Sequence, residues 1–203
     1  MAMWKTWLIG LVALAAIVAG RPVEAHPHIW IDVLATFQFD NAKVTGVRFQ
    51  WTFDEFFSAG VIAEFDKNNN KKFDANEIEG VRTGAFEGVK EVGFFTDVLI
   101  DGQKFEIVDP KDFTAAVDKG AAVYQFTVAL PEPLDPAKQA LAVTVYDKSY
   151  FVDIAFQGGT EALKIAGSGA AQCAIDLLED RSNPLFGGAI FPKKAQLKCA
   201  QPK

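Results

Sequence analysis

The chain of 203 residues has few histidines, few cysteines and no apolar run long enough to span a bilayer comfortably. Its two histidines are His26 and His28, and its two cysteines are Cys173 and Cys199. A Ser/His/Asp or Cys/His catalytic triad needs a histidine that is free to meet a nucleophile elsewhere in the fold. Both histidines lie together near the N-terminus, so we expect no such triad and expect that the protein is not an enzyme.

The apolar run near the N-terminus covers residues 7–20 and follows the basic Lys5. A membrane-spanning helix needs about 20 residues, and this run is shorter. The pattern is typical of a secretory signal peptide, which we predict to cover residues 1–25 and to be cleaved after Ala25. An uncleaved membrane anchor is the alternative, although the Arg21-Pro22 pair directly after the run favours a signal peptide.

Cleavage would leave residues 26–203, which is enough chain for one domain with a substantial core. We expect this domain to be periplasmic, with no direct insertion into the membrane after cleavage. The whole chain has a formal net charge of −6. An acidic surface argues against nucleic acid and anionic membranes as partners, and it is compatible with cations.

The two cysteines suggest one disulfide, because an exported chain meets an oxidising compartment and the count is even. A bridge between Cys173 and Cys199 would stabilise the C-terminal segment by roughly 3 kcal/mol in the chain-entropy model. The alternative is that the two thiols serve as soft metal ligands.

Apolar and polar residues alternate along much of the chain, which predicts strands with one buried face. The expected strands cover residues 29–39, 47–53, 94–100, 104–108, 112–117, 121–130, 140–147 and 149–156. Spacings of three and four residues predict two amphipathic helices, at 54–65 and 74–92. We also expect a rigid connector at 131–136 and a short helix at 171–179. The fold class is mainly β (α+β): a largely antiparallel, sandwich-like domain with a helical insertion at about 54–92.

The polar stretch between the two expected helices resembles an EF-hand calcium loop. Its oxygen-bearing residues follow the EF-hand spacing, with the ligand at the seventh position supplied by a backbone carbonyl. The expected calcium ligands are Asp66, Asn68, Asn70, Lys72 (backbone), Asp74 and Glu77.

One position departs from the EF-hand pattern, because Lys71 stands where the motif has glycine. A positive φ there costs a residue with a side chain roughly 1–2 kcal/mol. Three lysines also offset the three acidic residues of the loop. We therefore expect weak calcium binding, at about 10⁻⁴–10⁻³ M. The alternative is a loop that keeps the pattern and no longer binds.

The histidine pair would gain a nitrogen ligand on cleavage, because His26 would then carry the α-amine. The amine, the His26 imidazole and the His28 imidazole could together bind one ion, and residues i and i+2 of an extended chain project to the same side. Nitrogen ligands suit nickel, cobalt, copper or zinc. Pro27 has no N–H, which blocks binding through a deprotonated amide at that position. The alternative is that both side chains bind nothing.

Carboxylates that could complete such a site must come from elsewhere in the chain. Asp32 lies on the same strand face as His28 but roughly 13 Å away along the strand. Asp147 and the pair Asp54-Glu55 are candidates by residue type. We favour a role in a turn for Asp147 and helix capping for Asp54-Glu55.

Several motifs occur in order, including HPHIWID, WTFDEFFS, PLDP and VYDKSYFV. With them the chain resembles a family of exported bacterial proteins of unknown function, commonly labelled periplasmic components of uncharacterised ABC-type transport systems. The resemblance runs from about His26 to Phe156 and implies metal handling beside nickel/cobalt-type transporters. Two residues depart from the family pattern: Lys148 stands where proline is usual, and Lys71 where glycine is usual.

We therefore expect a periplasmic metal-binding accessory protein, with His26 and His28 as ligands and a membrane metal transporter as partner. One alternative is a calcium-stabilised interaction domain in which Trp30, Trp51 and Phe56-Phe57 dock a partner, although we expect those aromatics to pack in the core. A second alternative is a brace-type copper enzyme.

Overall fold

The computed structural model describes residues 28–170 and 172–200. The signal peptide predicted at residues 1–25 and the predicted ligand His26 lie outside these ranges. The strands are β1 (Ile29–Asp40), β2 (Lys43–Phe53), β3 (Thr96–Ile100), β4 (Gln103–Phe105), β5 (Lys111–Asp118), β6 (Ala121–Leu134), β7 (Leu141–Val145), β8 (Val152–Ala155), β9 (Leu163–Gly167), β10 (Cys173–Glu179) and β11 (Lys193–Cys199).

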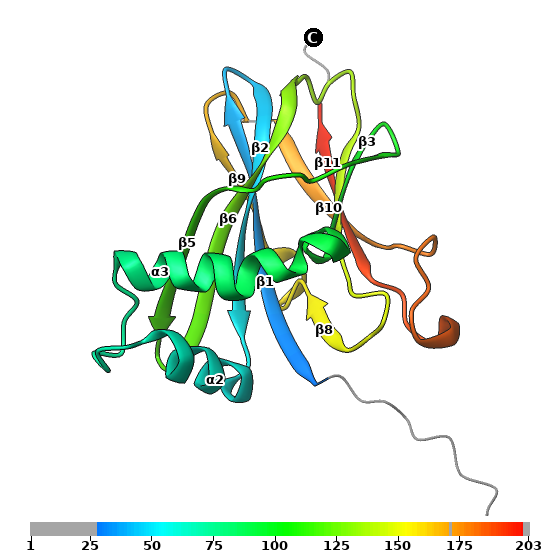
Figure 1. The fold of residues 1–203 in the computed structure, drawn as a ribbon. Coiled ribbons are helices and arrows are strands. Elements are labelled where there is room, and N and C mark those ends of the chain that lie inside the picture. The colour runs from blue at the N-terminus through cyan, green and yellow to red at the C-terminus, as the bar shows by residue number, and fades with distance from the viewer. Residues whose placement is uncertain (1–27, 171, 201–203) are drawn as a thin grey trace, which may run out of the picture.

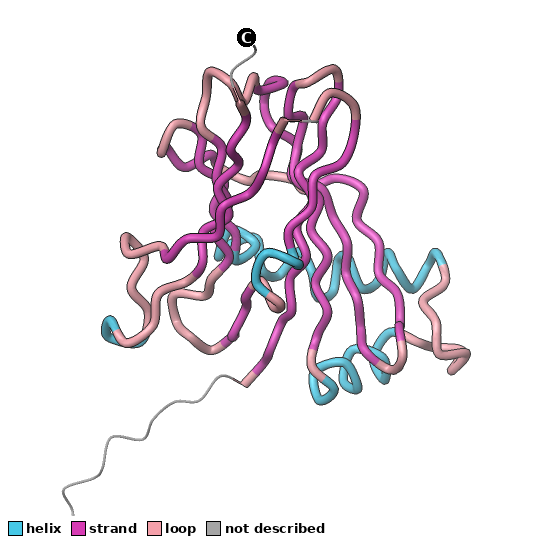
Figure 2. Tube along the Cα trace, turned by 180° about the vertical axis from the view of Figure 1, so that it is seen from behind, coloured by secondary structure: helices cyan, strands magenta, loops and turns pink. Residues whose placement is uncertain are grey.

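The strands form two sheets that pack together, so the mainly β class is confirmed (Figure 1). One sheet has the order β5-β6-β2-β1-β8, with β9 also paired to β1. The other has the order β10-β11-β7-β3-β4. Figure 2 shows the two sets of strands from behind, close together near the C-terminal end and further apart toward the helices.

The hairpin of β1 and β2 forms the centre of the larger sheet, as the alternation predicted. Val33, Phe37 and Phe49 are fully buried on its inner face. The turn between the strands has positive φ angles at Asn41 and Ala42, which suit a two-residue hairpin connection.

The second edge of β1 is shared by two short strands: β8, which lies within the strand expected at 149–156, and β9, which the sequence did not indicate. β8 runs parallel to the first part of β1, with Ile29 opposite Val152. β9 runs parallel to its later part, with Ala35 opposite Leu163. The sheet is therefore mixed, although most strand pairs are antiparallel.

The helical insertion begins where β2 ends. It contains α2 (Glu55–Phe65) and α3 (Ala75–Val81), followed by a π-helical turn η1 (Arg82–Phe86) and a 3₁₀ segment η2 (Glu87–Phe95). The helix expected at 74–92 is α-helical only to Val81; the chain stays helical beyond it as η1 and η2, until the backbone leaves helical values at Val92. Glycine lowers helix propensity, and a Cβ on Gly84 would lie only 3.0 Å from the Phe65 ring, so close packing between the helical segments keeps glycine there.

Two expectations for the later chain are wrong. The helix expected at 171–179 is replaced over Cys173–Glu179 by β10, which pairs with β11, because cross-strand pairing overrides the local preference. The segment 131–136 is not simply a connector, since β6 continues to Leu134. The pairing of β6 with β2 shifts register there, and a bulge tolerates Pro131 and Pro133, which lack N–H groups.

Candidate functional site

His28 lies exposed at the entry to β1 and is held by the loop before β8. Its backbone N–H donates to the Phe151 carbonyl at 2.9 Å. Its imidazole lies against the Phe151 ring, with 4.8 Å between ring centroids. His28 therefore has a defined position, and its side chain remains accessible.

The loop that holds Phe151 is organised by the carboxylate of Asp147. That carboxylate accepts hydrogen bonds from the backbone N–H groups of Ser149, Phe151 and Val152, at 2.9, 3.0 and 3.0 Å, and from the Ser149 hydroxyl at 2.6 Å. Burial acts to raise the pKa of Asp147, but these bonds outweigh burial and hold its pKa below the usual value. The favoured prediction, a turn role for Asp147, is confirmed.

Asp54 is likewise occupied by the backbone. It is the N-cap of α2, and its Oδ1 accepts hydrogen bonds from the N–H groups of Phe56 and Phe57 at 2.8 and 3.0 Å. Helix capping, the favoured role for Asp54, is therefore confirmed. Within residues 28–170 and 172–200, no group of three or more His, Cys, Asp and Glu side chains is placed to hold a metal ion.

The loop between α2 and α3 is tightly hydrogen-bonded through its polar side chains. The Asp66 carboxylate, on a buried residue, accepts hydrogen bonds from the N–H groups of Asn70 at 3.1 Å and Lys71 at 2.9 Å. Glu77 closes the loop, because its two oxygens accept hydrogen bonds from the N–H groups of Lys67 and Asp74, both at 2.8 Å.

The side-chain amides of the same loop converge on one carboxylate. Asn68 and Asn70 both donate to Asp74 Oδ2, at 2.8 and 3.4 Å. The backbone has a positive φ at Asn69 (58°) and at Lys71 (63°). Lys71 therefore adopts the left-handed conformation that the sequence pattern expects of a glycine at this position.

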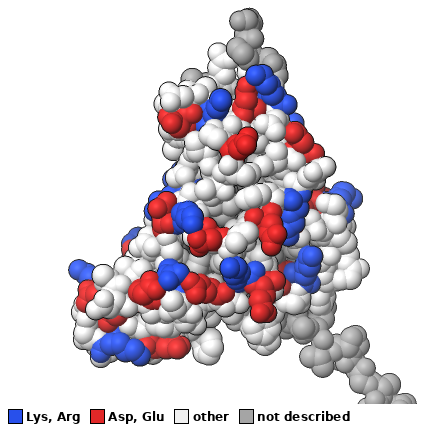
Figure 3. All heavy atoms as spheres, turned by 45° about the horizontal axis from the view of Figure 1, so that its top comes forward, with Lys and Arg blue, Asp and Glu red and all other residues white. Residues whose placement is uncertain are grey.

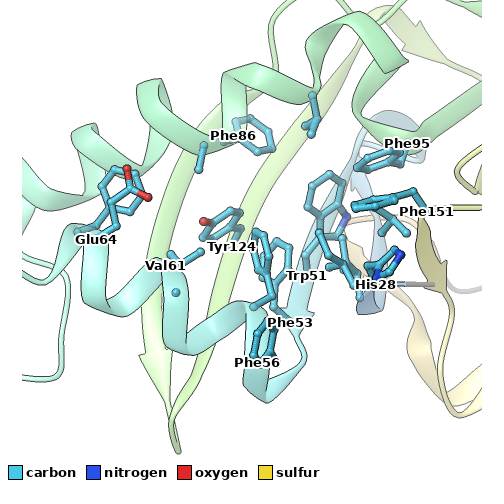
Figure 4. A pocket seen from close by; sticks show the side chains of 18 residues that line it. His28, Trp51, Phe53, Phe56, Val61, Glu64, Phe86, Phe95, Tyr124 and Phe151 are labelled. Atoms are coloured by element: carbon cyan, nitrogen blue, oxygen red, sulfur yellow. The ribbon is translucent and has the colours of Figure 1, made fainter. Parts of the chain in front are cut away.

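A cavity of about 610 Å³ lies between the helical insertion and the larger sheet (Figure 4). Its wall is mainly aromatic and aliphatic, and His28 and Phe151 contribute to it. From the helices come Gly60, Val61 and Phe86, and from β2 and β6 come Trp51, Phe53 and Tyr124. Apolar clefts of this size are the usual form of small-molecule sites.

Two polar atoms in the wall of this cavity have no hydrogen-bond partner among the described residues: the Trp51 indole Nε1 and the Tyr124 hydroxyl. Both residues are almost fully buried, at 1% and 2% exposure. Burial raises the pKa of Tyr124, and the nearby carboxylate of Glu64 raises it further, so the hydroxyl keeps its proton.

Sequence reasoning did not identify this cavity. Trp51 is buried, as expected for a core aromatic, but Trp30 is 46% exposed and Phe56 is 87% exposed, so the expectation of core packing is wrong for those two. Alternation along a strand shows which side chains face inward. The alternation gives no sign that the helices leave a cavity between themselves and the sheet.

The predicted disulfide is confirmed, because Cys173 is bonded to Cys199. The two residues are directly opposite one another in the pairing of β10 with β11. Both thiols are thereby consumed, which removes the alternative of soft metal ligands.

The surface charge is mixed on the face shown in Figure 3, where acidic and basic residues alternate over short distances. Most ion pairs of the described residues are exposed, as between Arg181 and Glu179, and such pairs contribute little to stability. Within the described part of the chain, none of the helices has the length and apolar character needed to cross a bilayer.

Together these features define a mainly β protein with a C-terminal disulfide and a helix–loop–helix insertion over an apolar cavity. The chain belongs to the family described as "Protein of unknown function (DUF1007)", whose model matches residues 11–184. The expectation of a family of unknown function is therefore confirmed.

Two relatives illustrate how far the similarity reaches. An "Uncharacterized 15.5 kDa protein in trpE 3'region" from Spirochaeta aurantia is 32% identical over 139 residues, which are 66% of this chain and 95% of that protein. An "Uncharacterized protein" from Haemophilus influenzae is 28% identical over 137 residues, which are 66% of this chain and 64% of that protein. The chain thus spans less than two thirds of the second relative.

Proposed function

We propose that the protein is a periplasmic, non-catalytic accessory protein that binds a transition-metal ion through His26 and His28. Removal of residues 1–25 would create the site, and a membrane metal transporter would be the partner. The observation that carries the proposal is the position of His28. Its backbone is hydrogen-bonded to Phe151 while its imidazole stays exposed, two residues after the predicted terminus.

The chemistry of the ligand set favours nickel, cobalt, copper or zinc. Two imidazoles and one α-amine supply three nitrogen ligands. These ions prefer nitrogen ligands to carboxylate ligands. An amine with a pKa of about 8 loses its proton to a metal near neutral pH. Because Asp54 and Asp147 are occupied by backbone N–H groups, the site as proposed relies on nitrogen alone.

Calorimetry on two forms of the mature protein tests this proposal. One form begins at His26, and the other carries one additional residue before it, which displaces the amine and leaves both imidazoles in place. We expect one ion per chain and much weaker binding in the extended form. Equal affinities would contradict the three-nitrogen site, and mass determination of the exported protein shows whether His26 is the true terminus.

A second proposal concerns the architecture and calcium. The two packed sheets would form a sandwich-like domain, and the loop of residues 66–77 would be an EF-hand-like insertion that binds calcium. The proposed ligands are those of the sequence pattern: Asp66, Asn68, Asn70, the Lys72 carbonyl, Asp74 and Glu77. Support comes from the convergence of the Asn68 and Asn70 amides on Asp74, which place donors where a cation would otherwise meet that carboxylate. Calcium would stabilise the insertion without rearranging it, because the helices already pack on the sheet.

Thermal unfolding with and without millimolar calcium tests the second proposal. Calcium should raise the melting temperature, and Glu77→Gln should remove that rise. Glu91→Gln is the matched control, because Glu91 is an exposed residue of the same insertion outside the loop. A parent protein that shows no shift with calcium would refute calcium binding and leave the nitrogen site unaffected.

A further inference from the structure

The cavity beneath the helical insertion has features that are not needed for either metal proposal. It reaches about 610 Å³, and its wall is made mostly of apolar and aromatic side chains. In Figure 4, side chains from α2 on one side and from β2 and β6 on the other face the same space. The exposed rings of Phe56 and Phe151 stand in the same wall, where they extend the apolar surface toward solvent.

Two unpartnered polar atoms lie behind the cavity wall, and neither has appreciable accessible surface. The indole N–H of Trp51 can only donate a hydrogen bond, and the Tyr124 hydroxyl can donate or accept. Leaving such groups buried without partners costs free energy. In Figure 4 the indole nitrogen lies on the side of Phe95 and Phe151, and the Tyr124 hydroxyl points toward the side of Val61 and Glu64.

The charge of the wall indicates what a ligand must not carry. Among the residues that line the cavity, none is lysine or arginine; Glu64 supplies a carboxylate and His28 an imidazole. That carboxylate already disfavours a tyrosinate at Tyr124. Beside Glu64 an anionic ligand would meet the same repulsion, with no lysine or arginine in the wall to offset it.

From these observations we propose that the cavity is a binding site for an uncharged, mainly apolar small molecule. The aromatic walls would bury the apolar body. This site needs no metal, although its wall includes His28 of the proposed metal site.

Two glycines provide a matched pair of variants. Gly60 lines the cavity from the middle of α2, and a Cβ there would meet no atom within 4 Å, so Gly60→Leu can extend into the cavity without a clash at its base. Gly88 also has open space around an added Cβ, but it lies outside the cavity wall. Leucine has the higher helix propensity, so Gly60→Leu should keep the fold of α2.

The experiment measures binding of Nile red, an uncharged apolar dye with a carbonyl oxygen, by its fluorescence in the absence of added metal. We expect saturable binding of one dye per chain. Gly60→Leu should weaken binding at least tenfold, and Gly88→Leu should leave it unchanged.

Other outcomes would overturn the proposal. Equal binding by the parent and Gly60→Leu would place the dye outside the cavity. Tighter binding of the anionic dye anilinonaphthalene sulfonate, lost in Gly60→Leu, would contradict an uncharged ligand. A dimer that Gly60→Leu dissociates and that excludes Nile red would identify a second copy of the chain as the occupant.

Discussion

Asp54 and Trp30 bind each other through two hydrogen bonds that join the start of α2 to the start of β1. The Asp54 N–H donates to the Trp30 carbonyl at 3.0 Å, and the Trp30 N–H donates to Asp54 Oδ2 at 3.0 Å. The other carboxylate oxygen caps the helix. One aspartate thus fixes the helical insertion to the segment that begins at His28.

Replacing Asp54 with alanine should lower the free energy of unfolding by about 2 kcal/mol, because it removes the cap and the bond from Trp30 together. Urea denaturation measures this loss. Glu55→Ala is the control: Glu55 is an exposed acidic residue in the same helical turn, so its loss should cost under about 1 kcal/mol. Equal losses in the free energy of unfolding would show that the hydrogen bonds of Asp54 stabilise the fold no more than an exposed acidic residue does.

Lys71→Gly should stabilise the protein by about 1 kcal/mol without calcium, because Lys71 has a φ of 63° that glycine adopts without steric cost. Asn69→Gly is the matched comparison, since Asn69 has a similar φ of 58° but asparagine tolerates this region better. Thermal unfolding should therefore show the larger gain for Lys71→Gly. A loss of stability in that variant would mean that the lysine side chain stabilises the loop.

Asp147→Asn should destabilise the protein by roughly 1.5–3 kcal/mol near neutral pH, because the loop before β8 loses hydrogen bonds to a charged acceptor. The pKa of Asp147 is lowered in the folded protein, so its contribution is complete above the unfolded value of 3.8 and is lost as the pH falls through the folded pKa. Urea midpoints of parent and variant should therefore converge in acid. A difference that persisted there would point to altered packing.

Asp153 should show the opposite pH dependence. Burial raises the pKa of its carboxyl group, which means that the folded state disfavours the charged form. Asp153→Asn should thus raise the melting temperature near neutral pH, by an amount worth under about 1 kcal/mol because the group keeps some solvent contact. The gain should disappear as the pH falls through the folded pKa, where the parent carboxyl is neutral as well. A variant that is less stable at neutral pH would contradict this.

Reduction of the Cys173–Cys199 disulfide should lower stability by roughly 3 kcal/mol, since the bond closes a loop between residues that are 26 apart in the chain. Unfolding with and without reductant measures the loss. The double variant Cys173→Ala/Cys199→Ala controls for other effects of the reductant and should be insensitive to it. A parent that is equally insensitive would show that the unfolded chain gains little freedom from reduction.

The central hairpin was predictable because its signal is local. Val33 and Phe37 on one strand, and Phe49 on the next, alternate with polar residues and are buried together. The parallel pairing of β1 with β8 and β9 joins segments more than a hundred residues apart, for which the sequence offers no periodic signal. The strand at Cys173–Glu179 was predicted as a helix for a related reason, since its identity depends on its partner β11.

The candidate sites also differ in whether local sequence spacing predicts them. The spacing of oxygen-bearing residues from Asp66 to Glu77 identified a loop that does fold on itself through their hydrogen bonds. The roles of Asp54 and Asp147 were predictable because capping and turn formation involve near neighbours. The cavity beside Trp51 and Tyr124 depends on where a helix lies relative to a sheet, and residue spacing along the chain does not contain that information.

The arrangement of β1 has a consequence for how the chain reaches its folded state. β1 comes first in the sequence, yet the strands that cover its second edge end only at Ala155 and Gly167. Because a chain is made from its N-terminus, this edge stays open after the hairpin with β2 can form, and an open edge invites pairing with other chains. Completing the sheet needs contacts of long sequence separation, which form slowly. The interval before β8 and β9 arrive is therefore when the protein is most exposed to aggregation, and when a chaperone would benefit it most.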